Sequence, residues 1–293
     1  MTHPATAAEA LSGLIRLRPH GWLASPLPTD PAAVTDHLHT ALADHEHPAA
    51  AEPLRVLAAR ATAAVASLGN PPRAVLKLHA DPDAYNAELV AYALVGNSPV
   101  LPRLLSLADT SYSLLIEYVP HSFDWTVPDA PATVVDAVAA VHVAPDLLDA
   151  AAADIFTLFR LDRLAAATAT AWLPDPGAWR AVLDLCRDAY GGSRIPVGHL
   201  DLKPEHVRLR DDGALALLDV ETLRPDITGL IDLITLPAVL RQAGRPLPGP
   251  DVRALYQHAA ARHGLHWTTN SLRAALIAYQ RATGLATLDQ LAD

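Results

Sequence analysis

The sequence predicts an α+β fold in which most strands precede residue 120 and helices fill most of the remainder. A short apolar run with β-branched and aromatic residues, typical of a buried strand, occurs at 113–119, and a further short strand is expected at 74–79. A tight hairpin is predicted at 207–220, around the turn residues Asp211-Asp212-Gly213. The chain is 51% apolar but only 5% aromatic, and its abundant alanine favours closely packed helices.

Composition and charge argue against several classes of protein, among them membrane-spanning and nucleic-acid-binding proteins. No stretch approaches about 20 residues without a charge or a proline, so we expect no membrane span. The N-terminus, MTHPATAAEALSGLIRLRPHGW, lacks the basic start and compact apolar core of a signal peptide, which predicts a cytoplasmic location. The net charge of −10 argues against nucleic-acid binding and would attract cationic partners. The single cysteine, Cys186, excludes an internal disulfide and a cysteine-rich metal site.

Residues 1–53 form an N-terminal extension in which the sequence predicts only one short helix. That helix covers 31–43, with Asp30 as its cap and Pro31 in its first turn. Four histidines in this extension lack a supporting cysteine or carboxylate geometry, so we expect a solvent-exposed surface rather than a metal site. They are His37, His39, His45 and His47.

Two interpretations of 54–68 stay open. The run LRVLAARATAAVASL is either an alanine-rich helix by propensity or two strands that turn near 60–62. The strand at 74–79 then carries Lys77. Asp81-Pro82-Asp83 opens a helix that ends near Gly96, with a cap, an early proline and a terminal glycine. This helix contains Glu88, eleven positions after Lys77.

The stretch 198–221 gathers ionisable side chains in an otherwise apolar segment. If the hairpin closes at its Asp-Gly turn, His206 lies beside Asp219, because opposed side chains in a ladder are roughly 4.5–5.5 Å apart at Cβ. The loop before the hairpin brings Asp201 and Lys203 to the same edge. One sheet edge would therefore collect carboxylates, imidazoles and a lysine.

These motifs resemble the aminoglycoside phosphotransferase and choline kinase-like family of the protein-kinase-like fold. The run H-L-D-L-K-P-E-H at 199–206 resembles a kinase catalytic loop, and D-V-E at 219–221 stands in place of D-F-G. The run A-V-L-K-L-H at 74–79 resembles the strand that carries the phosphate-binding lysine. The chain departs from the family at His206, where Asn is usual, and it lacks a glycine-rich phosphate loop.

The resemblance implies a two-lobed protein-kinase-like fold. Residues 54–119 would form a small N-terminal lobe with an antiparallel sheet, one key helix and the hinge. Residues 120–293 would form a larger, mostly helical lobe with the catalytic hairpin at 195–221. His142 is expected to pack or cap a helix, and Asp232 resembles the family's aspartate that braces the catalytic loop. Helices are expected at 132–143, 149–171, 178–190, 228–240, 251–263 and 271–282.

The resemblance also implies an enzyme, a kinase that transfers phosphate from ATP to a hydroxyl of a small molecule. The acceptor would be an antibiotic-like compound, an amino sugar or a metabolite. Asp201 would accept the hydroxyl proton and Lys203 would neutralise charge on the transferred group. Lys77, aligned by Glu88, would hold the nucleotide phosphates, and His199 would brace the loop.

The implied cofactors are ATP and Mg²⁺. Asp219 and His206 would hold the metal, although a neutral imidazole is a poorer ligand for Mg²⁺ than an amide oxygen. The backbone of Glu117 and Val119 would meet the adenine. No nucleic-acid or membrane partner is expected, and the chain would act as a monomer or a homodimer.

Three other interpretations stay open. A catalytically weak or silent kinase-like nucleotide-binding protein is favoured by His206 and by the missing glycine loop. A kinase that acts on a peptide is favoured by the run D-L-K-P-E, although no obvious activation segment separates Asp219 from the helix at 228. A structural helical protein in which the motif arose by chance is the least favoured of the three.

Overall fold

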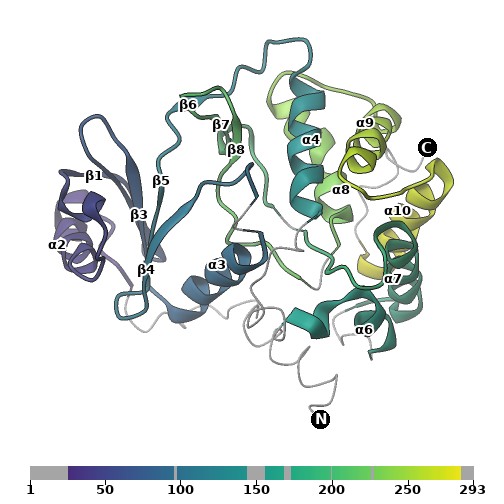
Figure 1. The fold of residues 1–293 in the computed structure, drawn as a ribbon, viewed down its shortest axis with the longest axis horizontal. Helices are drawn as coiled ribbons and strands as arrows, with labels where there is room; N and C mark the ends of the chain where they lie inside the picture. Colours follow the sequence, from purple (N-terminus) through teal and green to yellow (C-terminus); the bar gives the residue numbers. More distant parts are fainter. Residues whose placement is uncertain are drawn as a thin grey trace.

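The computed structural model describes most of the chain: residues 26–95, 98–143, 156–167, 173–198, 200–225 and 228–284, without the side chain of residue 158. Within them, a sheet lobe lies on one side and a helical lobe on the other, with a three-stranded sheet between the two (Figure 1). The two-lobed α+β architecture predicted from the sequence is confirmed. In the described part of the chain, none of the helices has the length and apolar composition needed to span a bilayer.

The sheet lobe is built on five antiparallel strands in the order β1-β2-β3-β5-β4. Their bounds are β1 (Leu54–Ala59), β2 (Ala63–Leu68), β3 (Ala74–His79), β4 (Leu104–Ala108) and β5 (Ser113–Glu117). The helical alternative for 54–68 is therefore wrong. Pairing with β3 overrides the helix propensity of the alanines, because it buries every second side chain of β2, namely Ala64, Ala66 and Leu68.

Helix α2 (Pro31–Leu42) packs on this sheet at the outer end of the molecule (Figure 1). Asp30 caps it as predicted, because its carboxylate accepts the N–H of Ala33 at 2.8 Å. Val34 and Leu38 are fully buried in one apolar core with strands β2 and β3. Part of the N-terminal extension is thus integral to the sheet lobe.

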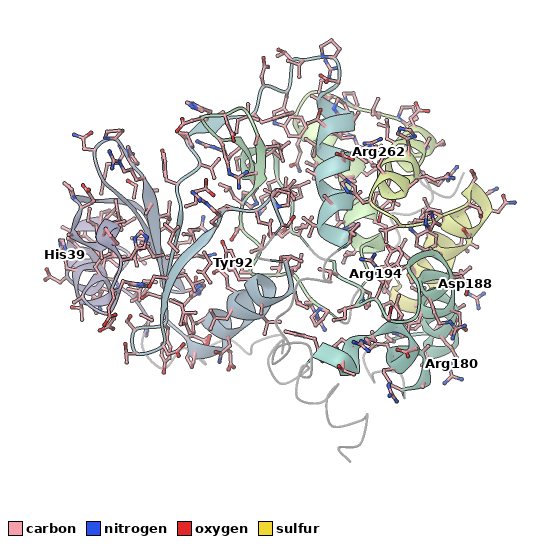
Figure 2. The ribbon with its side chains drawn as sticks, in the orientation of Figure 1. His39, Tyr92, Arg180, Asp188, Arg194 and Arg262 are labelled. Atoms are coloured by element: carbon pink, nitrogen blue, oxygen red, sulfur yellow. The ribbon has the colours of Figure 1, made fainter. Side chains whose placement is uncertain are left out.

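His45 is buried, so its predicted exposure is wrong. Its Nδ1 lies 3.0 Å from the hydroxyl of Ser106 on β4, and its Nε2 lies 2.9 Å from the hydroxyl of Ser113 on β5. These bonds hold the end of α2 against the sheet, and burial lowers the pKa of His45. His37 and His39 are exposed as predicted, and Figure 2 shows His39 on the outer side of α2.

We expect acid to destabilise the protein through His45. The pKa of His45 is lower in the folded state than the ~6.5 of a free imidazole, so the unfolded chain binds more protons. The stability that neutral His45 contributes is therefore complete above about pH 6.5 and is lost as the pH falls towards the lowered pKa. Thermal unfolding at pH 7.5 and 5.5 should show a larger loss of Tm in the wild type than in His45→Gln. Equal losses would show that His45 does not titrate in this range.

Helix α3 (Pro82–Val95) connects β3 to β4 and faces both lobes. Asp81 accepts the N–H of Asp83 at 2.9 Å and so satisfies a donor of the first turn. Apolar side chains of α3 lie in the same core as the helices of the second lobe, and Figure 2 shows Tyr92 between the two lobes. The key helix predicted for the N-terminal lobe is confirmed.

The predicted hairpin is confirmed in the central sheet, which consists of β6 (His121–Ser122), β7 (Val207–Leu209) and β8 (Leu215–Leu217). The strands β7 and β8 pair in the register that sets Val207 opposite Leu217. Gly213 has a φ of 81°, the left-handed conformation that glycine supplies without strain. The N–H of Leu218 donates to His206 at 2.8 Å, which brings the end of β8 beside the start of β7.

The helical lobe contains α4 (Ala130–His142), α6 (Leu161–Ala166), α7 (Pro176–Tyr190), α8 (Leu230–Gln242), α9 (Gly249–Arg262) and α10 (Thr269–Thr283). Helix α7 packs against α10, and α4 packs against α9 (Figure 1). Five of the six predicted helices are confirmed to within a few residues. The helix predicted at 149–171 lies partly outside the described residues. Within the described part, the helix is interrupted at Arg160. Arg160 has an extended backbone there, because the next residue, Leu161, donates its N–H to Arg194 instead.

Candidate active site

Lys77 points from the middle of β3 into a group of three carboxylates. Its Nζ lies 3.0 Å from Glu88 on α3, 3.1 Å from Asp219 and 2.6 Å from Glu221. Asp219 and Glu221 follow β8, more than 140 residues after Lys77 in the sequence. The fold thus joins the strand lysine, the helix glutamate and the end of the hairpin in one ionic cluster.

Burial and charge act in opposite directions in this cluster. Burial disfavours the charged form of Lys77, but the carboxylates of Glu88, Glu221 and Asp219 outweigh it and raise the pKa of Lys77 above its usual range. Burial likewise raises the pKa of Glu88, and the charge of Lys77 outweighs it, so that the net shift of Glu88 is downward. Both groups are therefore ionised, and removal of either would take one charged partner away from a buried charge.

Asp219 lies between the lysine and His206. Its Oδ1 accepts a hydrogen bond from Lys77, whereas its Oδ2 lies 3.8 Å from Nε2 of His206. Burial raises the pKa of Asp219, but the nearby ammonium of Lys77 outweighs that effect and lowers the pKa overall. Asp219 is thus an ionised carboxylate with one oxygen directed at an imidazole, as the hairpin register predicted.

Asp201 and Lys203 lie together on the loop before the hairpin. Nζ of Lys203 donates to Oδ2 of Asp201 at 3.0 Å, and both side chains are about half exposed. Asp201 and Asp219 have φ values of 43° and 63°, a left-handed backbone that is uncommon outside glycine. Such strain costs on the order of 1–3 kcal/mol and persists where the surroundings enforce it, often at functional sites. His199, at the start of this loop, lies outside the described residues.

A buried network supports the loop from below. The N–H of Leu200 donates to Oδ1 of Asp232 on α8 at 2.6 Å, which confirms the bracing predicted for this aspartate. Nε2 of His142 lies 3.0 Å from Oδ2 of Asp232, and its Nδ1 lies 2.7 Å from the hydroxyl of Tyr256. The packing role predicted for His142 is also confirmed. The residue at 229 must be glycine, because a Cβ there would collide with the His142 ring.

A cavity of about 440 Å³ opens beside Asp201. The loop before the hairpin forms one wall and α8 forms the other, and the lining includes both apolar and polar side chains. It is lined by Asp201, Leu202, Lys203, Glu205, Ile231, Asp232, Thr235, Ala238, Val239 and Gln242. A small molecule in this cavity would have a carboxylate at its edge.

The two predicted hinge residues lie where the chain leaves the N-terminal sheet. The backbone N–H of Glu117 donates to the carbonyl of Arg103 at 2.9 Å, so that N–H is already occupied. An adenine contact from Glu117 would therefore use its carbonyl oxygen. Val119 is buried two residues later.

Arg210 is a residue that the sequence did not single out, and it ties the hairpin to the hinge. Its guanidinium donates to the carbonyls of Pro99 at 2.9 Å and Leu101 at 2.6 Å, both in the connection after α3. Its Nε also donates to the carboxylate of Glu117 at 3.1 Å. One planar guanidinium thus holds together the hairpin, the connection after α3 and the end of β5.

We expect Arg210→Lys to lower the free energy of unfolding by about 1.5–3 kcal/mol, because an ammonium cannot reach all these acceptors and Glu117 would lose its partly buried guanidinium partner. Denaturant unfolding measures the change. Arg103→Lys is the matched control, since Arg103 also pairs with Glu117 but is 75% exposed and should contribute less than about 1 kcal/mol. Equal effects of the two variants would contradict the role of Arg210.

Comparison with known proteins gives structural similarities only. No protein-family model and no curated protein sequence matches the chain. A choline/ethanolamine kinase family protein from Mesorhizobium loti is 16% identical, with 84% of this chain and 82% of that chain covered and a TM-score of 0.47. A macrolide 2′-phosphotransferase from Brachybacterium faecium is 20% identical, with 82% and 90% covered and a TM-score of 0.45. A choline kinase from Streptococcus pneumoniae is 13% identical, with 75% and 78% covered and a TM-score of 0.43.

The fold is assigned from this chain's own geometry. A five-stranded antiparallel sheet is followed by a helical lobe, and one helix is inserted between the third and fourth strands. An ion pair joins the lysine of the third strand to a glutamate of that helix, which is the arrangement of protein kinases. The protein is similar to the three solved structures along most of its length, and its strand order, helix α3 and Lys77–Glu88 pair are those of the two-lobed protein-kinase-like fold.

Proposed function

We propose that the protein is an ATP-dependent phosphotransferase that phosphorylates a hydroxyl group of a small molecule. The observation that carries the proposal is the convergence of Lys77, Glu88 and Asp219 from three separate segments on one ionic cluster. Phosphoryl transfer requires mainly positioned reactants and charge neutralisation, and a few fixed ions can supply both.

Lys77 would hold the nucleotide phosphates, and Glu88 would keep the ammonium directed towards them. The donor set near Asp219 fits a magnesium ion. Two atoms that share an ion lie at most about twice the ~2.1 Å ligand distance apart, and Oδ2 of Asp219 lies 3.8 Å from His206. Mg²⁺ held by Asp219 and His206 would neutralise charge on the phosphates.

Transfer would take place at the catalytic loop. Asp201 would accept the proton of the incoming hydroxyl, and Lys203, 3.0 Å away, would offset charge on the transferred group. The cavity between this loop and α8 offers a space for the acceptor next to Asp201. The backbone of Glu117 and Val119 would contact the adenine between the lobes.

Calorimetric titration with ATP, in Mg²⁺ and in excess EDTA, tests the nucleotide part of the proposal. We expect saturable binding in Mg²⁺ and a large loss of affinity in EDTA, because the cation would join the phosphates to Asp219. A screen of hydroxyl compounds for acceptor-dependent ATP consumption tests the transfer part. Absence of ATP binding under both conditions would contradict the proposal.

A catalytically silent nucleotide-binding protein is the second candidate, and His206 is the observation that favours it. An amide oxygen suits Mg²⁺ better than an imidazole nitrogen does, so this residue weakens the site if the ion binds there.

His206→Asn distinguishes the two candidates. In an active enzyme we expect the variant to reach half-maximal ATP consumption at a lower Mg²⁺ concentration than the wild type, by a factor of a few. In a silent protein the wild type would transfer phosphate to no acceptor, and the variant would gain slow ATP hydrolysis. An unchanged Mg²⁺ dependence would remove His206 from the metal site.

A further inference from the structure

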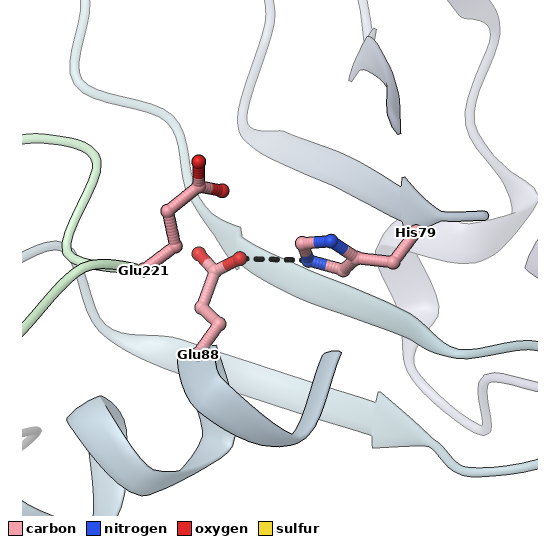
Figure 3. Close-up of side chains that lie close together, drawn as sticks. All are labelled: His79, Glu88 and Glu221. Carbon is pink, nitrogen blue, oxygen red and sulfur yellow. Dashed lines mark hydrogen bonds and ion pairs between the residues drawn. The ribbon is translucent and has the colours of Figure 1, made fainter. Parts of the chain in front are cut away.

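His79 ends strand β3 two residues after Lys77, on the same face of the strand. It is 3% exposed, and its Nε2 lies 2.8 Å from Oε2 of Glu88. The same carboxylate oxygen lies 3.0 Å from the ammonium of Lys77. Figure 3 shows the imidazole reaching Glu88 from one side, with Glu221 on the other.

A metal site at this place is not supported. Ligand atoms of His79, Glu88 and Glu221 lie within 4.8 Å of one another, which suits a cation. However, Nζ of Lys77 already lies 2.6 Å from Glu221 and 3.0 Å from Glu88. An ammonium therefore holds the position that a metal ion would need, and His79 has to be explained as a partner of Glu88.

The hydrogen bond has a defined direction. Lys77 keeps Glu88 ionised, and an ionised carboxylate can only accept hydrogen bonds. Nε2 of His79 must therefore carry the proton and donate it to Glu88. Oε2 thus accepts from two donors on one strand, and in the described part of the chain only Lys77 is shared with other carboxylates.

The imidazole is itself fixed by its surroundings. The backbone N–H of His79 donates to the carbonyl of Tyr112 at 3.0 Å, and the residue pairs with Ala63 in the ladder. Its ring lies 6.3 Å from the ring of Tyr85 on α3, and the hydroxyl of Tyr85 donates to Asp109 at 2.8 Å. His79 therefore links the end of β3 to helix α3 at a point that does not depend on Lys77.

We propose that His79 is a positioning residue that keeps Glu88 in place when Lys77 turns towards nucleotide phosphates; this inference rests on the proposed function. The ammonium of Lys77 pairs with three carboxylates, those of Glu88, Asp219 and Glu221. Phosphates would draw the ammonium towards themselves, and the buried carboxylate of Glu88 would then rely on its second donor. A fixed imidazole would keep the carboxylate of Glu88 within reach of the Lys77 ammonium.

Two variants separate hydrogen bonding from packing. His79→Leu keeps an apolar side chain of moderate size but has no donor, whereas His79→Gln keeps a donor on a side chain long enough to reach Glu88. We expect His79→Leu to weaken Mg²⁺-ATP binding about tenfold or more in calorimetry, and His79→Gln to recover most of the loss. The KM for ATP should rise in His79→Leu while the KM for the acceptor stays constant.

Tyr85→Phe is the matched control, because it removes a hydrogen bond at the same helix without touching Glu88. It should lower Tm but leave ATP affinity unchanged. If His79→Leu binds ATP like the wild type, or if Tyr85→Phe weakens binding as much, the positioning role is overturned. If the wild type itself does not bind Mg²⁺-ATP, the proposed function fails and this inference fails with it.

A second measurement does not depend on whether His79→Leu folds. The Nε2–H of His79 should give a slowly exchanging NMR signal, assigned by its absence from His79→Gln. We expect the signal both without nucleotide and with bound Mg²⁺-ATP, since the bond to Glu88 persists in both states. Loss of the signal on nucleotide binding would show that the bond breaks when Lys77 is engaged, and would overturn the proposal.

Discussion

Asp201→Asn is expected to retain Mg²⁺-ATP binding and to lose about 10²- to 10⁴-fold in turnover. The amide has nearly the shape of the carboxylate, but it cannot take the proton from the acceptor hydroxyl. The groups proposed to bind nucleotide, Lys77 and Asp219, pair with each other, whereas Asp201 pairs with Lys203. Steady-state rates with an acceptor, together with calorimetry for ATP, measure the two effects.

Glu205→Gln is the matched control for that variant. Glu205 lines the same cavity from the same loop and is exposed, so neutralising it should change turnover far less. A turnover of Asp201→Asn close to that of the wild type would show that the base lies elsewhere. Equal losses of turnover in the two variants would indicate that the negative charge of the loop, and not a base at Asp201, promotes the reaction of the acceptor.

Asp219→Ala is expected to abolish Mg²⁺-dependent ATP binding. The variant loses the carboxylate that faces both Lys77 and His206, and no other carboxylate among the described residues pairs with His206. Glu221→Ala should weaken binding less, because Glu221 is 41% exposed and, among the described residues, its one ion pair is with Lys77. Calorimetry in saturating Mg²⁺ measures both variants.

Unchanged affinity in Asp219→Ala would contradict the metal assignment. A stronger loss in Glu221→Ala than in Asp219→Ala would move the metal to Glu221. Circular dichroism is the control for folding, since removal of either carboxylate changes the charge balance around buried Lys77.

The parts of the fold with short-range signals were predictable. The hairpin follows from its Asp-Asp-Gly turn, and α3 follows from the cap at Asp81 and the proline after it. The segment 54–68 was not decidable, because its alanines favour a helix and only pairing with β3 makes it a pair of strands. The burial of His45 could not be predicted either, because its serine partners lie 61 and 68 residues away in the sequence.

Site residues that are close in sequence were likewise predictable, whereas those that depend on long-range contacts were not. Asp201, Lys203, His206 and Asp219 fall within one short motif, so the sequence itself placed them close together. Arg210 was missed because two of its acceptors are backbone carbonyls about 110 residues away, and a backbone carbonyl leaves no signal in the residue types.

The position of His79 in the sequence also carries a usable signal. A histidine two positions after a strand lysine faces the same side of the strand. It can therefore reach the partner of that lysine.

Phosphoryl transfer by this protein is tested most directly by ³¹P NMR with Mg²⁺-ATP and a mixture of hydroxyl compounds. We expect the γ-phosphate signal of ATP to decline while a phosphate-ester signal grows, with ADP as the other product. The same mixture with Asp201→Asn should show no ester on that time scale. ATP that stays intact with every acceptor, or that yields only inorganic phosphate at equal rates in both proteins, would contradict the account.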